Sequence, residues 1–118
     1  MSELRELTER ILEFRDRRDW RQFHNPKDLA IALSVEAAEV LELFRFKSVE
    51  EARLEGLPDE LADVLYFVLL LAHEAGVDLV RALDQKMAHN EEKYPVSLSR
   101  GRNLKYTELG EGLSNSHE

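Results

Sequence analysis

The stretch "LSVEAAEV", residues 33–40, decides the fold class of this chain. Its apolar residues favour a buried position, yet Glu36 and Glu39 stand among them, three residues apart. On a helix, which turns about 100° per residue, Glu36 falls in the middle of one apolar stripe and Glu39 at its edge. The opposite side is apolar too, with Ile31, Val35 and Leu41. A helix that is apolar on both sides is expected inside a bundle or at a subunit interface.

The rest of the chain has the same helical character. Helical spacing and end signals predict helices over residues 3–18, 26–46, 58–75 and 79–94. Asn25 is a good N-cap before Pro26, Gly76 is a natural stop, and Asp78 can cap the last helix. We therefore predict an all-α fold, a four-to-five-helix bundle. Residues 1–96 would form one helical domain, and residues 97–118 an extended tail whose end is disordered.

Charge and composition exclude several classes of function. The 118 residues carry a net charge of -8 and include no cysteine. The negative charge argues against nucleic acid or an anionic membrane as partner. The absence of cysteine excludes a disulfide framework and a thiol nucleophile. The charged start "MSELRELTER" predicts no signal peptide, and we expect a cytoplasmic protein.

Two acidic pairs stand out, Glu36 with Glu39 and Glu60 with Asp63. Acidic residues at this spacing are common in the chain, but these pairs lie among apolar neighbours. Burying an unpaired carboxylate costs several kcal/mol, and neither helix offers a basic residue near its pair on the same face. A divalent cation is the economical remedy, and all-oxygen ligands suit Mg²⁺, with Mn²⁺ as an alternative.

A di-iron carboxylate bundle is a competing interpretation. Such sites use Glu-x-x-His on two of their helices. None of the four histidines lies three residues after a glutamate, which weighs against it.

Several segments together resemble a known family. "EAAE" and "ELAD", on successive predicted helices, resemble the metal signature of the MazG-like all-α nucleoside triphosphate pyrophosphatases, and most closely that of the dCTP pyrophosphatases within them. "RDWRQFHNPKDLAIAL", "LFRFK", "KMAHNEEKYP" and "KYTEL" extend the resemblance over nearly the whole chain. It implies an intertwined homodimer or homotetramer. It also implies that Glu36, Glu39, Glu60 and Asp63 are catalytic residues that hold Mg²⁺.

The resemblance also implies a nucleotide pocket. Trp20 would border the base, with Phe46 and Phe67 where the relatives have a tryptophan and a tyrosine. Further candidate substrate contacts are His24, Lys86, Asn90 and Tyr94, the last three being spaced along one face of the fourth helix. Without the resemblance, Trp20 and His24 would be interpreted as packing residues, and the helix face as polar surface.

The function implied is hydrolysis of a deoxynucleoside triphosphate, with a dCTP-like preference, to the monophosphate and pyrophosphate. Such an enzyme would clean the nucleotide pool. Three alternatives stay open: a broad or dUTP/dUDP-directed activity, a non-catalytic helical oligomer that binds metal or nucleotide, and a carboxylate metal store.

Overall fold

The structure, a computed structural model, describes residues 2–109. Its elements are α1 (Glu3–Arg17), η1 (Arg21–Phe23), α2 (Pro26–Glu42), η2 (Leu54–Gly56), α3 (Leu57–Ala75), α4 (Leu79–Lys93) and α5 (Val96–Ser99), where η marks a short 3₁₀ helix. No strand occurs within residues 2–109. The predicted all-α fold is confirmed.

Local capping chemistry sets the helix ends. The side chain of Asn25 accepts a hydrogen bond from the Asp28 amide at 2.9 Å, which satisfies a free donor at the start of α2. Asp78 caps α4 in the same way. Gly76 ends α3 with φ at 68°, a left-handed conformation that glycine adopts without a steric penalty. These three ends lie where the sequence predicted them.

Two segments differ from the expectation. Helix α2 ends at Glu42, before the predicted end near residue 46, because the amides of Leu43, Phe44 and Lys47 bond three residues back. Phe46 then takes a left-handed φ of 60°. The segment expected to be extended contains α5 and a helical turn at residues 106–109. The predicted disorder of the last residues lies outside the described chain, and the domain boundary at residue 96 stays a prediction.

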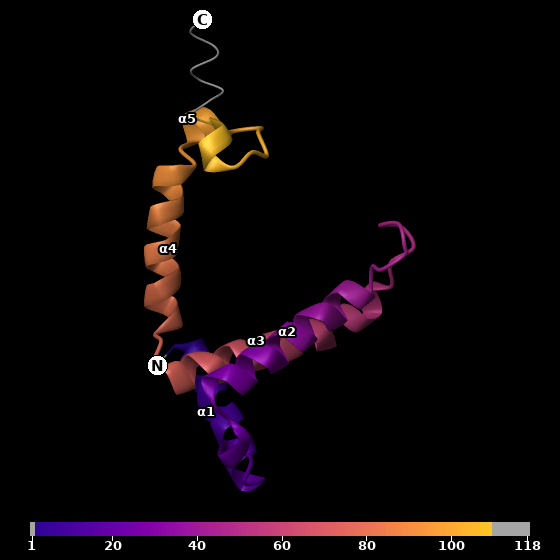
Figure 1. Cartoon of the computed structure of the whole chain (residues 1–118), viewed down its shortest axis with the longest axis vertical. Coiled ribbons are helices and arrows are strands. Elements are labelled where there is room, and N and C mark those ends of the chain that lie inside the picture. Colours follow the sequence, from indigo (N-terminus) through magenta and orange to yellow (C-terminus); the bar gives the residue numbers. More distant parts are fainter. Residues whose placement is uncertain (1, 110–118) are drawn as a thin grey trace, which may run out of the picture. The chain divides into compact units, whose positions relative to one another are not determined.

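The chain divides into two compact units, Met1–Val77 and Asp78–Glu118. In the first unit α2 and α3 run side by side as a helical hairpin, and α1 packs on α3 (Figure 1). Its core is centred on Leu29 of α2 and on Leu69, Leu70 and Ala72 of α3. The hairpin is what brings the two acidic pairs to facing positions.

The second apolar side of α2 remains open in a single chain. Ile31, Val35 and Leu41 are each more than half exposed, with relative accessibilities of 53%, 52% and 61%. Such a row of large apolar side chains is typical of a surface that another subunit covers. No helix within residues 2–109 has the length and apolar character needed to cross a bilayer.

Candidate functional site

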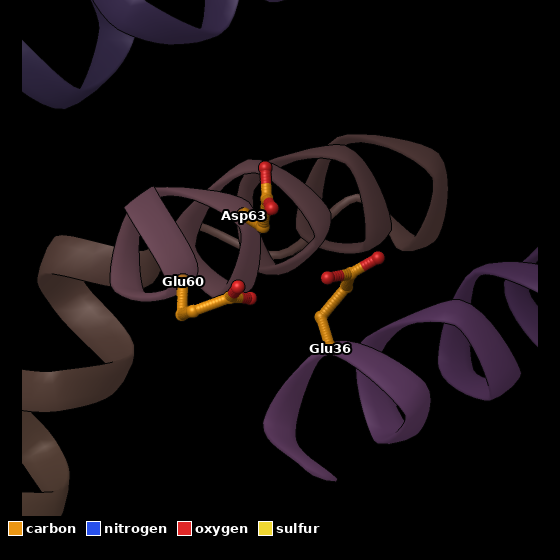
Figure 2. A group of neighbouring side chains, drawn as sticks. All are labelled: Glu36, Glu60 and Asp63. Atoms are coloured by element: carbon orange, nitrogen blue, oxygen red, sulfur yellow. The ribbon is translucent and has the colours of Figure 1, made fainter. Parts of the chain in front are cut away.

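Three carboxylates meet between α2 and α3. Glu36, Glu60 and Asp63 each offer an oxygen, and these oxygens lie within 4.8 Å of one another. Figure 2 shows Glu36 on α2 facing the two acidic residues of α3. Oxygens on opposite sides of an octahedral Mg²⁺ ion lie about 4.2 Å apart. The group therefore fits a hard divalent cation after small side-chain rotations.

The electrostatics of this group favour a cation. Loss of water contact raises the pKa of the Glu60 carboxyl, and the negative charges of Glu39, Asp63, Glu36 and Asp59 raise it further. Every charge that shifts this pKa is a carboxylate. A positive ion between the helices would relieve both the repulsion and the incomplete hydration.

Glu39, the fourth predicted ligand, lies outside the group of three. It is exposed, while Glu36 and Glu60 are half-buried and Asp63 is exposed. Glu39 lies about one helical turn beyond Glu36 on α2, yet its negative charge still raises the pKa of Glu60. Its role as a ligand stays a prediction, and its position suits a base beside the three carboxylates equally well.

A cavity of about 620 Å³ opens beside the acidic group. It lies within the Met1–Val77 unit and is lined by α1, the turn after it and α3: Leu7, Arg10, Ile11, Phe14, Trp20, His24, Asp63, Tyr66 and Phe67. Its volume falls in the range of small-molecule sites, and its aromatic walls suit a planar ring. Asp63 belongs both to this cavity and to the acidic group, so the two form one site.

The aromatic wall is organised by edge-to-face contacts. Phe14 contacts Trp20 with ring centroids 5.7 Å apart, and it contacts Tyr66 at 6.4 Å. The Arg18 guanidinium lies 3.7 Å from the Phe14 ring centroid and also donates to the Phe14 carbonyl oxygen. Phe14 is thus held from several sides, and Trp20, at 42% exposure, keeps part of its surface available for a ligand.

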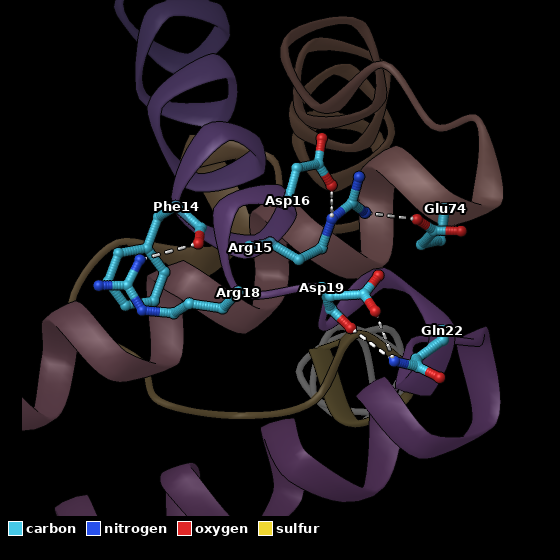
Figure 3. Close-up of polar contacts among 7 residues, drawn as sticks. All are labelled: Phe14, Arg15, Asp16, Arg18, Asp19, Gln22 and Glu74. Atoms are coloured by element: carbon cyan, nitrogen blue, oxygen red, sulfur yellow. Dashed lines mark hydrogen bonds and ion pairs between the residues drawn. The ribbon is translucent and has the colours of Figure 1, made fainter.

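A buried ion pair ties α1 to α3 near this wall. Arg15 is only 3% exposed, and its guanidinium donates to Glu74 and to Asp16, each at 2.9 Å (Figure 3). The Arg15 carbonyl oxygen accepts from the Trp20 amide at 3.1 Å. One residue therefore fixes both the crossing of the two helices and the turn that carries Trp20.

His24 lines the cavity as a neutral imidazole. Burial lowers its pKa, the Arg15 charge lowers it further, and Glu74 opposes the shift. Its Nδ1 atom is buried and has no hydrogen-bond partner within residues 2–109. A neutral ring with an unused polar atom is suited to bind a water molecule or a ligand.

The structure does not bring every predicted residue to this site. Phe46 is 92% exposed, does not line the cavity, and has the Arg45 guanidinium 4.8 Å from its ring centroid. Lys86, Asn90 and Tyr94 lie in the Asp78–Glu118 unit, where Tyr94 packs edge-to-face on Tyr106. Their roles as substrate contacts stay predictions.

Sequence reasoning missed Arg10, Phe14 and Tyr66 as lining residues. A signal was present for α1: Leu7, Arg10, Ile11 and Phe14 have the spacing of a single helix face. Tyr66 gave no such signal, because it lies about 100° from Phe67 on the same helix and only the packing of α1 brings both to one cavity.

Comparison with known proteins shows the family that this chain resembles. Residues 31–109 match the sequence profile of the MazG-like family. A Rattus norvegicus protein named dCTP pyrophosphatase 1 is 43% identical over 114 residues, which are 90% of this chain and 67% of that protein. The Homo sapiens protein of the same name is 42% identical over 108 residues, 85% of this chain and 64% of that protein.

A solved structure resembles the fold as well. A crystal structure of a pyrophosphatase from Archaeoglobus fulgidus has a TM-score of 0.74 and 38% sequence identity. The match covers 80% of this chain and 94% of that one.

Proposed function

The chain belongs to the MazG-like family, and on that premise we propose that it hydrolyses a deoxynucleoside triphosphate, dCTP by preference, to the monophosphate and pyrophosphate. The observation that carries this proposal is Asp63, which is shared by the acidic group and the aromatic cavity. A nucleotide has the same two parts, an anionic phosphate chain that needs cations and a flat base that needs apolar walls.

The acidic residues divide the work of the reaction. Glu36, Glu60 and Asp63 hold Mg²⁺, or Mn²⁺ in its place, through carboxylate oxygens. The cation supplies positive charge for the phosphate oxygens and acidifies water. We assign Glu39 as the general base, because it lies outside the three ligands while its charge reaches Glu60.

The roles we propose define the bond changes. Glu39 takes a proton from a water molecule, whose oxygen attacks the α-phosphorus. The bond between the α-phosphorus and the bridging oxygen breaks, and pyrophosphate leaves with that oxygen. Trp20 and Phe67 hold the base in the cavity, which keeps the α-phosphorus beside the acidic group.

The assembly we propose is a homodimer or homotetramer in the cytoplasm. The exposed apolar residues Ile31, Val35 and Leu41 support a second copy of α2 as the covering surface. Sedimentation of the purified protein tests the oligomer directly.

The function itself is tested with a panel of dNTPs and Mg²⁺, with products separated by anion exchange. We expect pyrophosphate and dNMP, with dCTP consumed fastest. Orthophosphate as the product would refute the reaction, and a preference for dUTP or dUDP would support the alternative within the family. No turnover of any nucleotide would favour the non-catalytic alternative.

Variants tie the reaction to the site. Glu36→Gln and Asp63→Asn keep side-chain volume and remove a ligand charge, and we expect turnover to fall at least about a hundredfold. Both should also weaken Mn²⁺ binding in calorimetry. Glu42→Gln is the matched control, since Glu42 lies on α2 but pairs with Arg45. Full activity in both test variants would refute the metal assignment.

A further inference from the structure

Arg10 is the one arginine or lysine that lines the cavity within the described residues. It stands on α1 one turn before Phe14, so its side chain rises from the face that carries the aromatic wall. No ion pair within residues 2–109 engages its guanidinium. In contrast, Arg15 and Arg17 on the same helix have carboxylate partners. Arg10 therefore brings free hydrogen-bond donors to an otherwise largely apolar cavity.

Arg10 stands on the helix that carries the aromatic wall rather than on the two helices that carry the acidic group. The acidic group lies on α2 and α3. Arg10 rises from α1 beside Phe14, whose ring contacts Trp20. A ligand with its phosphates at Asp63 and its base among the aromatic rings would present the base edge to Arg10.

We propose that Arg10 is a specificity-determining residue whose guanidinium donates two hydrogen bonds to the O2 and N3 acceptors of a cytosine base. The guanidinium is a rigid fork of parallel N–H donors and requires two neighbouring acceptors. Cytosine offers them. Thymine and uracil carry a hydrogen on N3, so a donor would meet a donor and one bond would be lost. This inference rests on the proposed function and identifies the residue that selects the base.

The test compares 5-methyl-dCTP with dTTP, since these two nucleotides share the methyl group and differ only at C4 and N3 of the ring. In the wild type we expect kcat/KM to be higher for 5-methyl-dCTP. A bidentate contact of this kind supports roughly tenfold discrimination or more. In Arg10→Met and Arg10→Lys this ratio should fall by about that factor, because kcat/KM falls more for 5-methyl-dCTP, which loses two hydrogen bonds, than for dTTP, which loses one.

Lysine is the informative replacement, because it keeps the positive charge and loses the fork. If Arg10→Met slows both nucleotides equally and Arg10→Lys restores both, Arg10 contacts phosphate and the proposal is overturned. An unchanged ratio in both variants also overturns it. Arg5→Met is the matched control, since Arg5 is exposed on α1 and does not line the cavity.

The two proposals fail in different ways. A wild type that releases pyrophosphate from both nucleotides at the same rate refutes the role of Arg10 and leaves the enzymatic function standing. A wild type that hydrolyses neither refutes the enzymatic function itself. Arg10 is exposed, so its replacement should leave the helical signal in circular dichroism unchanged. An unchanged signal excludes misfolding as the cause of a changed ratio.

Discussion

Replacing Arg15 by methionine should destabilise the protein by about 3 kcal/mol, because breaking a buried ion pair leaves the surviving charge uncompensated. That cost ranges from about 3 to 5 kcal/mol for fully buried pairs. Arg15 is 3% exposed, but the Glu74 side chain is 23% exposed and keeps some hydration, which places the cost at the lower end. Asp16 is 54% exposed and adds little to the loss.

Urea denaturation followed by far-UV circular dichroism measures this effect. With a slope of about 1.5 kcal/mol per molar urea, a loss of about 3 kcal/mol lowers the midpoint by about 2 M. All variants must be compared at one protein concentration, because the proposed association of subunits would contribute to the measured stability.

Two further variants separate charge from packing. Arg15→Met combined with Glu74→Leu removes both charges, and we expect it to recover most of the loss. Arg17→Met is the control, since the Arg17 and Glu13 side chains are 72% and 63% exposed and such pairs contribute about 0.5 kcal/mol or less. The reasoning is refuted if Arg15→Met costs less than about 1 kcal/mol, or if the double variant is as unstable as the single one.

Three other perturbations test the site. Trp20→Ala should raise KM about tenfold and leave kcat within about twofold, because a stacked aromatic ring contributes to base binding. Steady-state kinetics on dCTP measures both constants, and a fall in kcat instead of a rise in KM would contradict the prediction. Without metal, Glu60→Gln should melt at a higher temperature than the wild type, because it removes the like-charge repulsion that raises the Glu60 pKa. Added Mg²⁺ should raise the melting temperature of the variant less than that of the wild type. Scanning calorimetry with and without the ion checks both results. The pKa of the His24 imidazole, measured by NMR, should lie below 6.5. Because the unfolded chain then binds the proton more tightly, the contribution of His24 to stability is full above pH 6.5 and is lost as pH falls through the lower folded pKa. A measured pKa above 6.5 would contradict the burial of this ring.

Local chemistry explains why the helix ends could be predicted. The caps at Asn25 and Asp78 and the left-handed stop at Gly76 depend only on neighbouring residues, so their signals are complete within a few positions. The end of α2 differs from the predicted one because residues 43–55 contain no glycine or proline, and the tighter turns that lead to Phe46 leave no mark in the sequence.

The acidic group could be predicted because burying unpaired carboxylates in an apolar stripe costs free energy, so their presence there needs an explanation. Which of them converge depends on the register of α2 against α3, and that register leaves Glu39 outside the group of three carboxylates. The Arg15–Glu74 pair joins residues 59 positions apart. Helical spacing carries no information at that distance, so neither the pair nor the cavity between α1 and α3 could be derived from it.

In the proposed site Asp63 serves the cation and the nucleoside at once, and this sharing would make the two ligands thermodynamically linked. If the bound ion changes the affinity for the nucleoside by some factor, the bound nucleoside must change the affinity for the ion by the same factor. A compound that fills only the aromatic cavity would therefore change how tightly the protein retains its metal, even though it carries no phosphate. Inhibitors of this site would best be ranked at a fixed free concentration of Mg²⁺.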